Sequence, residues 1–180
     1  MTKQKGNAAY ILRLTLTLFL ISAIVAGLLA LVNFVTADTI AEKTAEKAES
    51  AMRQVLEAEH YEPMDVPEGS AVTAAFRAGD KGYVVRVAPN GFGGAIDMMV
   101  GIDADGAVTG VAIVSQSETA SLGANCTRED FRQQFIGATD KLSVSKDGGT
   151  VDALTGATVT SRAVTEGVNT ALEFVQEVLQ

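Results

Sequence analysis

The stretch LTLTLFLISAIVAGLLALVNFVTA, from Leu14 to Ala37, contains no charged residue in its 24 positions. As a helix it is long enough to cross a hydrocarbon core about 30 Å thick. The pattern therefore predicts a membrane anchor at residues 14–37. A cleaved signal peptide ending at Val35-Thr36-Ala37 is the alternative, but its apolar segment would normally run only about 7–15 residues.

Charges on the two sides of this span predict its orientation. Three basic residues precede it, and the first charge after it is Asp38. By the positive-inside rule, residues 1–13 lie in the cytoplasm and the C-terminal domain lies on the periplasmic or extracellular side. From Asp38 onward the chain carries 11 basic and 22 acidic residues, a net charge of 11 − 22 = −11. Such an acidic exported domain is not expected to bind nucleic acid.

Several kinds of redox and metal site are excluded by composition. The chain has one cysteine, Cys126, and one histidine, His60. An intrachain disulfide, a multi-histidine zinc site and a cysteine-bound iron–sulfur cluster all need more such residues. We therefore assign no metal ligands. Cys126 is interpreted as a packing or helix-capping residue rather than a redox thiol.

Residue patterns after the span predict an α+β fold, with a small, mostly antiparallel sheet packed against helices. Residues 38–60 have apolar side chains at helical spacing and form an amphipathic helix. Residues 61–180 form the exported domain. Its expected elements are strands at 71–76, 81–88, 95–102, 107–116 and 150–154, a turn at 103–106, a helix at 127–135 with Thr127 as N-cap, and a helix at 160–179 with Val164, Val168, Leu172, Val175 and Leu179 on one face.

One junction between a strand and a helix concentrates hydroxyl groups. Residues 152–158 have the sequence DALTGAT, and Val159-Thr160-Ser161 follows. In a structural interpretation, Thr160 or Ser161 caps the last helix and Gly156 permits the turn. In a functional interpretation, exposed amides and the helix dipole bind a phosphate there, and a threonine hydroxyl carries it covalently.

The string Asp152-x-x-Thr155-Gly156-Ala157-Thr158 resembles the flavinylation motif of the FMN-binding domain family. In that family the last threonine is joined through its hydroxyl to the phosphate of FMN by a dedicated flavin transferase that uses FAD. The resemblance implies that Thr158 is the acceptor. It also implies that Leu154, Thr155, Gly156 and Ala157 shape the phosphate end of the site.

A second stretch supports the resemblance. The glycine-rich segment from Gly91 to Ile96 and the loop from Glu118 to Ala124 are similar to segments that border the flavin in this family. The residues implied to lie near the ring are Phe92, Gly93, Gly94, Glu118, Thr119, Leu122 and Gly123. The chain departs from the usual pattern at Phe92, Ala95, Ala120 and Ser121, where Tyr, Pro, Pro and Gly are common. No catalytic residue is implied.

The anchor, the following helix and the compact domain together resemble the G subunit of Rnf-type ion-translocating ferredoxin:NAD oxidoreductases. This implies an electron-carrier subunit without stand-alone activity, whose partners are the other membrane and cytoplasmic subunits and, during maturation, a flavin transferase. Two alternatives remain. One is the C subunit of the sodium-pumping NADH:quinone oxidoreductase or another membrane-anchored flavin reductase. The other is a structural anchor without a cofactor.

Overall fold

The computed structural model describes residues 3–67 and 69–179. The side chains of residues 3–8, 38, 41 and 42, which include the charged Lys3, Lys5, Asp38 and Glu42, lie outside the described part. The chain divides into two compact units, Met1–Glu46 and Lys47–Gln180. Helix α1 (Lys3–Val55) belongs to both units and includes the expected helix at 38–60 except its last five residues.

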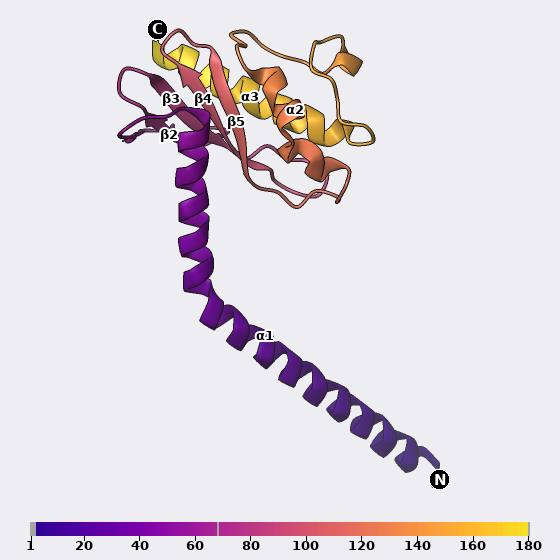
Figure 1. Cartoon of the computed structure of the whole chain (residues 1–180). Helices are drawn as coiled ribbons and strands as arrows, with labels where there is room; N and C mark the ends of the chain where they lie inside the picture. Colours follow the sequence, from indigo (N-terminus) through magenta and orange to yellow (C-terminus); the bar gives the residue numbers. More distant parts are fainter. Residues whose placement is uncertain (1–2, 68, 180) are drawn as a thin grey trace. The chain divides into compact units, whose positions relative to one another are not determined.

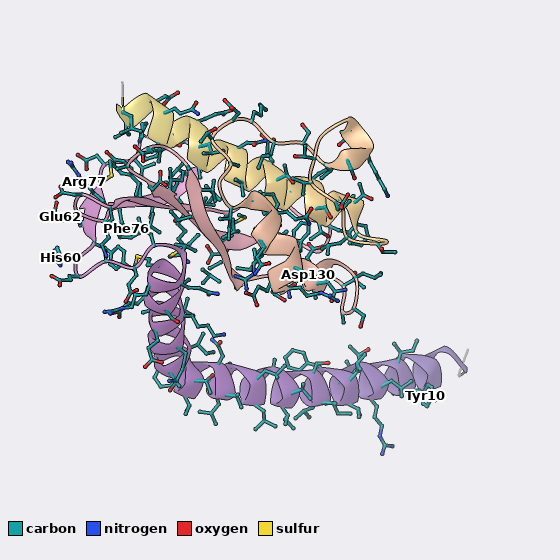
Figure 2. All side chains as sticks on the ribbon, turned by 45° about the horizontal axis from the view of Figure 1, so that its top comes forward. Tyr10, His60, Glu62, Phe76, Arg77 and Asp130 are labelled. Atoms are coloured by element: carbon teal, nitrogen blue, oxygen red, sulfur yellow. The ribbon has the colours of Figure 1, made fainter. Side chains whose placement is uncertain are left out.

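The first unit contains the apolar part of α1. Among the described residues, Ala9–Ala37 is the one helix segment long and apolar enough to cross a membrane, with a mean hydropathy of 2.6 and no buried residue. Its large apolar side chains are exposed, including that of Tyr10, which is labelled in Figure 2. A helix that is apolar on all sides suits a lipid environment, where its backbone hydrogen bonds are satisfied internally. The segment therefore fits a single-pass membrane anchor.

The second unit is built on an antiparallel sheet with the strand order β1-β2-β3-β4-β5. Sequence patterns correctly predicted the meander and missed β1, a three-residue edge strand. Its Pro63 fits an edge strand, because proline has no backbone N–H to donate to a neighbouring strand. Figure 2 shows Glu62 of β1 beside Phe76 and Arg77 of β2. The strands are β1 (Glu62–Met64), β2 (Val72–Arg77), β3 (Gly82–Val87), β4 (Asp97–Asp103) and β5 (Val108–Ser115).

The turn between β4 and β5 forms where the sequence predicted it. Asp103 Oδ1 accepts hydrogen bonds from the backbone N–H groups of Asp105 and Ala107, at 3.0 and 2.8 Å. Gly106 has a φ of +84°, a left-handed conformation that glycine adopts without strain. These hydrogen bonds and the glycine conformation hold the turn, which sets the register between β4 and β5.

The two faces of the sheet are covered by different helices. Because side chains alternate along a strand, Val84 and Met99 pack with Val55 at the end of α1, whereas neighbouring positions such as Val85 and Val100 pack with α3 (Thr158–Leu179). Figure 1 shows α3, in yellow, lying across the sheet. On the other face, Thr109 Oγ1 donates a hydrogen bond to the carbonyl oxygen of Val55 at 2.6 Å. Strands β3, β4 and β5 are therefore buried at most positions of both faces, and α3 packs on the face opposite Val55.

The segment between β5 and α3 corrects the predicted helix at 127–135, which is divided into shorter helical segments. Thr127 is not an N-cap, because its hydroxyl donates to the carbonyl of Ala124 and Arg128 stands at the cap position of α2 without a capping side-chain bond. Phe131 and Phe135 are both buried, with ring centroids 5.5 Å apart. The helices here are η1 (Gly123–Thr127), α2 (Glu129–Arg132), η2 (Gln133–Phe135) and η3 (Ser145–Asp147).

Three further expectations about the C-terminal part were wrong. Residues 150–154 make only an isolated bridge between Val144 and Val151, because side chains bind the next backbone N–H groups of Asp152 and Leu154. Helix α3 begins at Thr158 rather than at residue 160. Leu179 is 48% exposed, because the buried stripe of α3 ends at Val175.

Candidate functional site

A cavity of about 380 Å³ lies beside the first turn of α3. It brings together eight of the twelve residues that the sequence motifs predicted for the site, and it also includes Val159 and Thr160, which those motifs did not assign to it. The eight come from three separate segments of the chain. They are Phe92, Glu118, Thr119, Leu122, Gly123, Gly156, Ala157 and Thr158.

Glu118 ties these segments together. The residue is 9% exposed, and its carboxylate Oε1 accepts a hydrogen bond from the Gly93 N–H at 2.8 Å while Oε2 accepts one from the Thr160 hydroxyl at 2.6 Å. A Cβ at Gly123 would overlap this carboxylate. Glu118 therefore joins the glycine-rich segment and its own loop to α3, and both of its oxygens have partners within the protein.

Gly93 and Gly94 shape the rim without lining the cavity. A Cβ at Gly93 would overlap the carbonyl oxygen of Ser117, so only glycine allows this close approach. Gly94 has a φ of +144° and accepts a hydrogen bond from the Gly91 N–H at 2.8 Å. The resulting turn places Phe92 at the cavity with 75% of its surface exposed.

Leu154 and Thr155 are not brought into this cavity. They line a neighbouring hollow together with Leu122, which borders both spaces. Leu154 is partly buried against the main core, and its N–H donates to the Ser161 hydroxyl at 2.9 Å. Thr155 is exposed. Both residues shape the turn that leads into α3.

Neither predicted cap residue caps α3. The Thr160 hydroxyl binds Glu118, and the Ser161 hydroxyl donates back to the Ala157 carbonyl at 3.0 Å. The helix instead begins directly after a turn in which Gly156 has a φ of +75°. The first N–H groups of a helix have no partner inside the helix, so this end is suited to bind an anion.

Thr158, the first residue of α3, is half-buried and borders the cavity. Its Oγ1 accepts a hydrogen bond from Nζ of Lys146 in η3 at 2.8 Å. The next residue of η3, Asp147, forms a two-fold ion pair with Arg162, with N–O distances of 2.6 and 2.7 Å. Hydrogen bonding to Arg162 lowers the pKa of the Asp147 carboxyl. Sequence reasoning missed Lys146, because no motif joins it to Thr158.

Cys126 lies close to the site but is not part of it. Its side chain is completely buried in the main core. Burial, together with the negative charge of Glu118, raises the pKa of the thiol to about 11. The thiol therefore stays protonated at neutral pH, which supports its interpretation as a packing residue.

Comparison with known proteins places the chain in a family. Residues 91–173, which contain every residue of the cavity, match the FMN-binding domain, and residues 1–55 match the RnfG N-terminal region. The G subunit of the proton-translocating ferredoxin:NAD(+) oxidoreductase complex of Clostridium ljungdahlii is 37% identical over 90% of this chain and 88% of its own length. The chain belongs to the Rnf G-subunit family. Its FMN-binding domain is therefore the part that contains the candidate site.

One further relative supports the family, and one solved structure supports the fold. The G subunit of the Na(+)-translocating ferredoxin:NAD(+) oxidoreductase complex of Acetobacterium woodii is 34% identical over 97% of both chains. The C subunit of the Na(+)-translocating NADH-quinone reductase of Parabacteroides distasonis has a similar fold, with a TM-score of 0.54 over 76% of this chain and 84% of that chain. At 20% identity this last likeness concerns the fold alone.

Proposed function

We propose that Thr158 carries FMN through a phosphodiester bond, in an electron-transfer subunit of an ion-translocating ferredoxin:NAD oxidoreductase. The observation that carries this proposal is the position of the Thr158 hydroxyl. It stands at the N-terminus of α3, beside the cavity of the FMN-binding domain. Membership of the Rnf G-subunit family supports the redox role, because its relatives are subunits of such complexes.

The residues around the cavity fit FMN. A volume of about 380 Å³ lies within the range of about 300–1,000 Å³ that is usual for small-molecule sites. Phe92, Leu122 and Val159 offer exposed apolar surface for a flat ring system. The hydroxyl of Thr158 and the first turn of α3 offer a link and an anion site for the phosphate.

FMN, when bound, supplies the reversible uptake and release of electrons. The chain fixes where this happens. Thr158 attaches the cofactor, the apolar rim residues hold the ring, and Glu118 keeps the three surrounding segments in register. A covalent link also prevents loss of the cofactor by diffusion outside the cytoplasm.

We further propose that the N-terminus is cytoplasmic and that the FMN-binding domain lies on the periplasmic or extracellular side. The basic residues before the apolar segment of α1 support this orientation. The partners are then the other subunits of the Rnf-type complex, together with a flavin transferase during maturation. Alkaline phosphatase fused after Gln180 should be active in cells. An inactive but fully expressed fusion would contradict the orientation.

The covalent link is tested by expressing the full chain with an active flavin transferase. The wild-type band should fluoresce after denaturing electrophoresis and be heavier by one FMN less one water. Thr158→Ala should abolish both signals, whereas Thr150→Ala, at an exposed position outside the motif and outside the cavity, should still be loaded. An unmodified wild-type mass would instead favour a structural anchor without a cofactor.

A further inference from the structure

Lys146 binds the hydroxyl that we propose as the attachment point, although it belongs to no predicted motif and does not line the cavity. We propose that Lys146 is a positioning residue for the flavin phosphodiester. It holds the Thr158 hydroxyl before attachment and pairs with the negative charge of the phosphate afterwards. This inference rests on attachment of FMN at Thr158.

The distance supports this role directly. The Lys146 ammonium donates a hydrogen bond to Thr158 Oγ1 at 2.8 Å. In a phosphodiester, phosphorus is bonded to that same oxygen, so its anionic oxygens lie close to the ammonium as well. A hydrogen bond from an ammonium to an anionic oxygen is stronger than one to a neutral hydroxyl. The interaction should therefore strengthen once the phosphate is in place.

The loop that carries Lys146 is fixed to α3 by a second contact. Asp147 binds Arg162, and Lys146 binds Thr158. Positions 158 and 162 are four residues apart and lie on the same face of a helix. The consecutive loop residues Lys146 and Asp147 therefore bind adjacent turns of α3. Backbone hydrogen bonds from Ser145 to Val151 at 2.7 Å and from Gly149 to Val144 at 3.1 Å close the loop itself.

Of the two basic residues in these contacts, Lys146 is the one that is available to bind an anion near Thr158. Arg162 is neutralised by Asp147. Among the described residues, no carboxylate lies within ion-pair distance of Lys146, whose side chain instead binds the neutral Thr158 hydroxyl. An unpaired ammonium beside a helix N-terminus gives a local excess of positive charge in a strongly acidic domain. A phosphate would balance it.

The same contact bears on the attachment step. The Thr158 oxygen attacks the FMN phosphorus of FAD, its new P–O bond replaces the anhydride bond, AMP leaves with the electron pair, and a base of the flavin transferase takes the hydroxyl proton. Negative charge develops on Oγ1 as that proton departs. Lys146 stabilises this charge from a position that is already set before the reaction.

The test uses the full chain in detergent with purified flavin transferase and FAD, and follows the initial rate at which the protein band becomes fluorescent. Lys146→Met keeps most of the length of the side chain and removes its charge. It should slow loading about tenfold, at the low end for a charge-assisted hydrogen bond because the site is exposed. Lys146→Arg should restore most of the rate. The control is Lys141→Met, which removes an exposed lysine that pairs with Glu173 at 3.3 Å and should load normally.

The outcomes separate this inference from the proposal beneath it. Failure of the wild-type chain to accept FMN would overturn attachment at Thr158 itself. Equal loading rates for the wild type and Lys146→Met would overturn only the role of Lys146. Slow loading of Lys146→Arg would also overturn it, since arginine supplies the positive charge that the proposed role requires. Unfolding temperatures of the unloaded variants should match the wild type, and a lowered value for Lys146→Met would show a structural role instead.

Discussion

Two parts of the cavity lining, here called the Glu118 side and the Thr158 side, use their polar groups differently. On one side Glu118 is buried, and both carboxylate oxygens accept hydrogen bonds from the protein. On the other side the half-buried Thr158 hydroxyl receives its hydrogen bond from an exposed lysine. Both residues belong to segments that resemble the flavin-binding pattern. The difference indicates that Glu118 holds the fold of the site, whereas Thr158 remains accessible to a ligand and to a modifying enzyme.

The largest effect should come from removing the buried carboxylate. Glu118→Ala leaves the Thr160 hydroxyl and the Gly93 N–H without a partner, and we expect it to lower the free energy of unfolding by about 3 kcal/mol. Urea denaturation of the detergent-solubilised chain measures this. Glu166→Ala, at an exposed position of α3, is the matched control and should change little. Equal stability of the two variants would remove Glu118 from its structural role.

Gly93→Ala tests the same side through the backbone. The added Cβ would overlap the carbonyl oxygen of Ser117, a main-chain atom that cannot turn aside. We expect a loss of about 2 kcal/mol in the free energy of unfolding, in the range for overpacking. Thr119→Ala, in an exposed residue at the cavity, should be tolerated. If Gly93→Ala were equally harmless, the close approach of the two loops would not be required.

Cys126 supplies a pH test near the Glu118 side. Burial raises the pKa of its thiol from 9.0 to about 11, so the folded chain keeps a proton that the unfolded chain releases. The contribution of this thiol to stability should therefore be constant below about pH 9 and fall between pH 9 and 11, by on the order of 2 kcal/mol. Denaturation curves across this range should show the fall in the wild type. The fall should be smaller in Cys126→Ala, and parallel curves would contradict this assignment.

The smallest effect is expected on the Thr158 side. Lys146→Met should produce no measurable change in the free energy of unfolding, because exposed polar contacts contribute little to stability. Its effect should appear only in flavin loading. A clear loss of stability measured by urea denaturation would mean that both sides of the cavity serve the fold, and the contrast between them would disappear.

The sheet and α3 were predictable because local signals agreed with the tertiary structure. The alternating strands, the Asp103–Gly106 turn and the apolar stripe from Val164 to Val175 each carry their own pattern. The edge strand β1 was missed because three residues with a central proline give no alternation. The Thr127 cap failed because its hydroxyl had a nearer acceptor in the preceding turn. Pairing with β2 therefore decided the first, and a local hydrogen bond within the preceding turn decided the second.

The candidate site was predictable only in part, for a related reason. Short motifs predicted Thr158, Glu118 and the glycines as site residues, since each lies in a continuous stretch. Lys146 was out of reach, because its link to Thr158 depends on the fold of the loop at 143–151 and on the ion pair between Asp147 and Arg162. Leu154 and Thr155 were adjacent in sequence to the acceptor, yet the turn at Gly156 points them toward another hollow.

Attachment of FMN at Thr158 is tested most directly by tandem mass spectrometry of the loaded chain after trypsin digestion. Cleavage after Lys146 and Arg162 releases residues 147–162, a peptide with Thr158 and four other hydroxyl residues, Thr150, Thr155, Thr160 and Ser161. We predict that one FMN less one water is found on this peptide and that fragment ions place it on Thr158. An unmodified peptide from a chain exposed to active transferase, or FMN on any of the other four residues, would contradict this attachment.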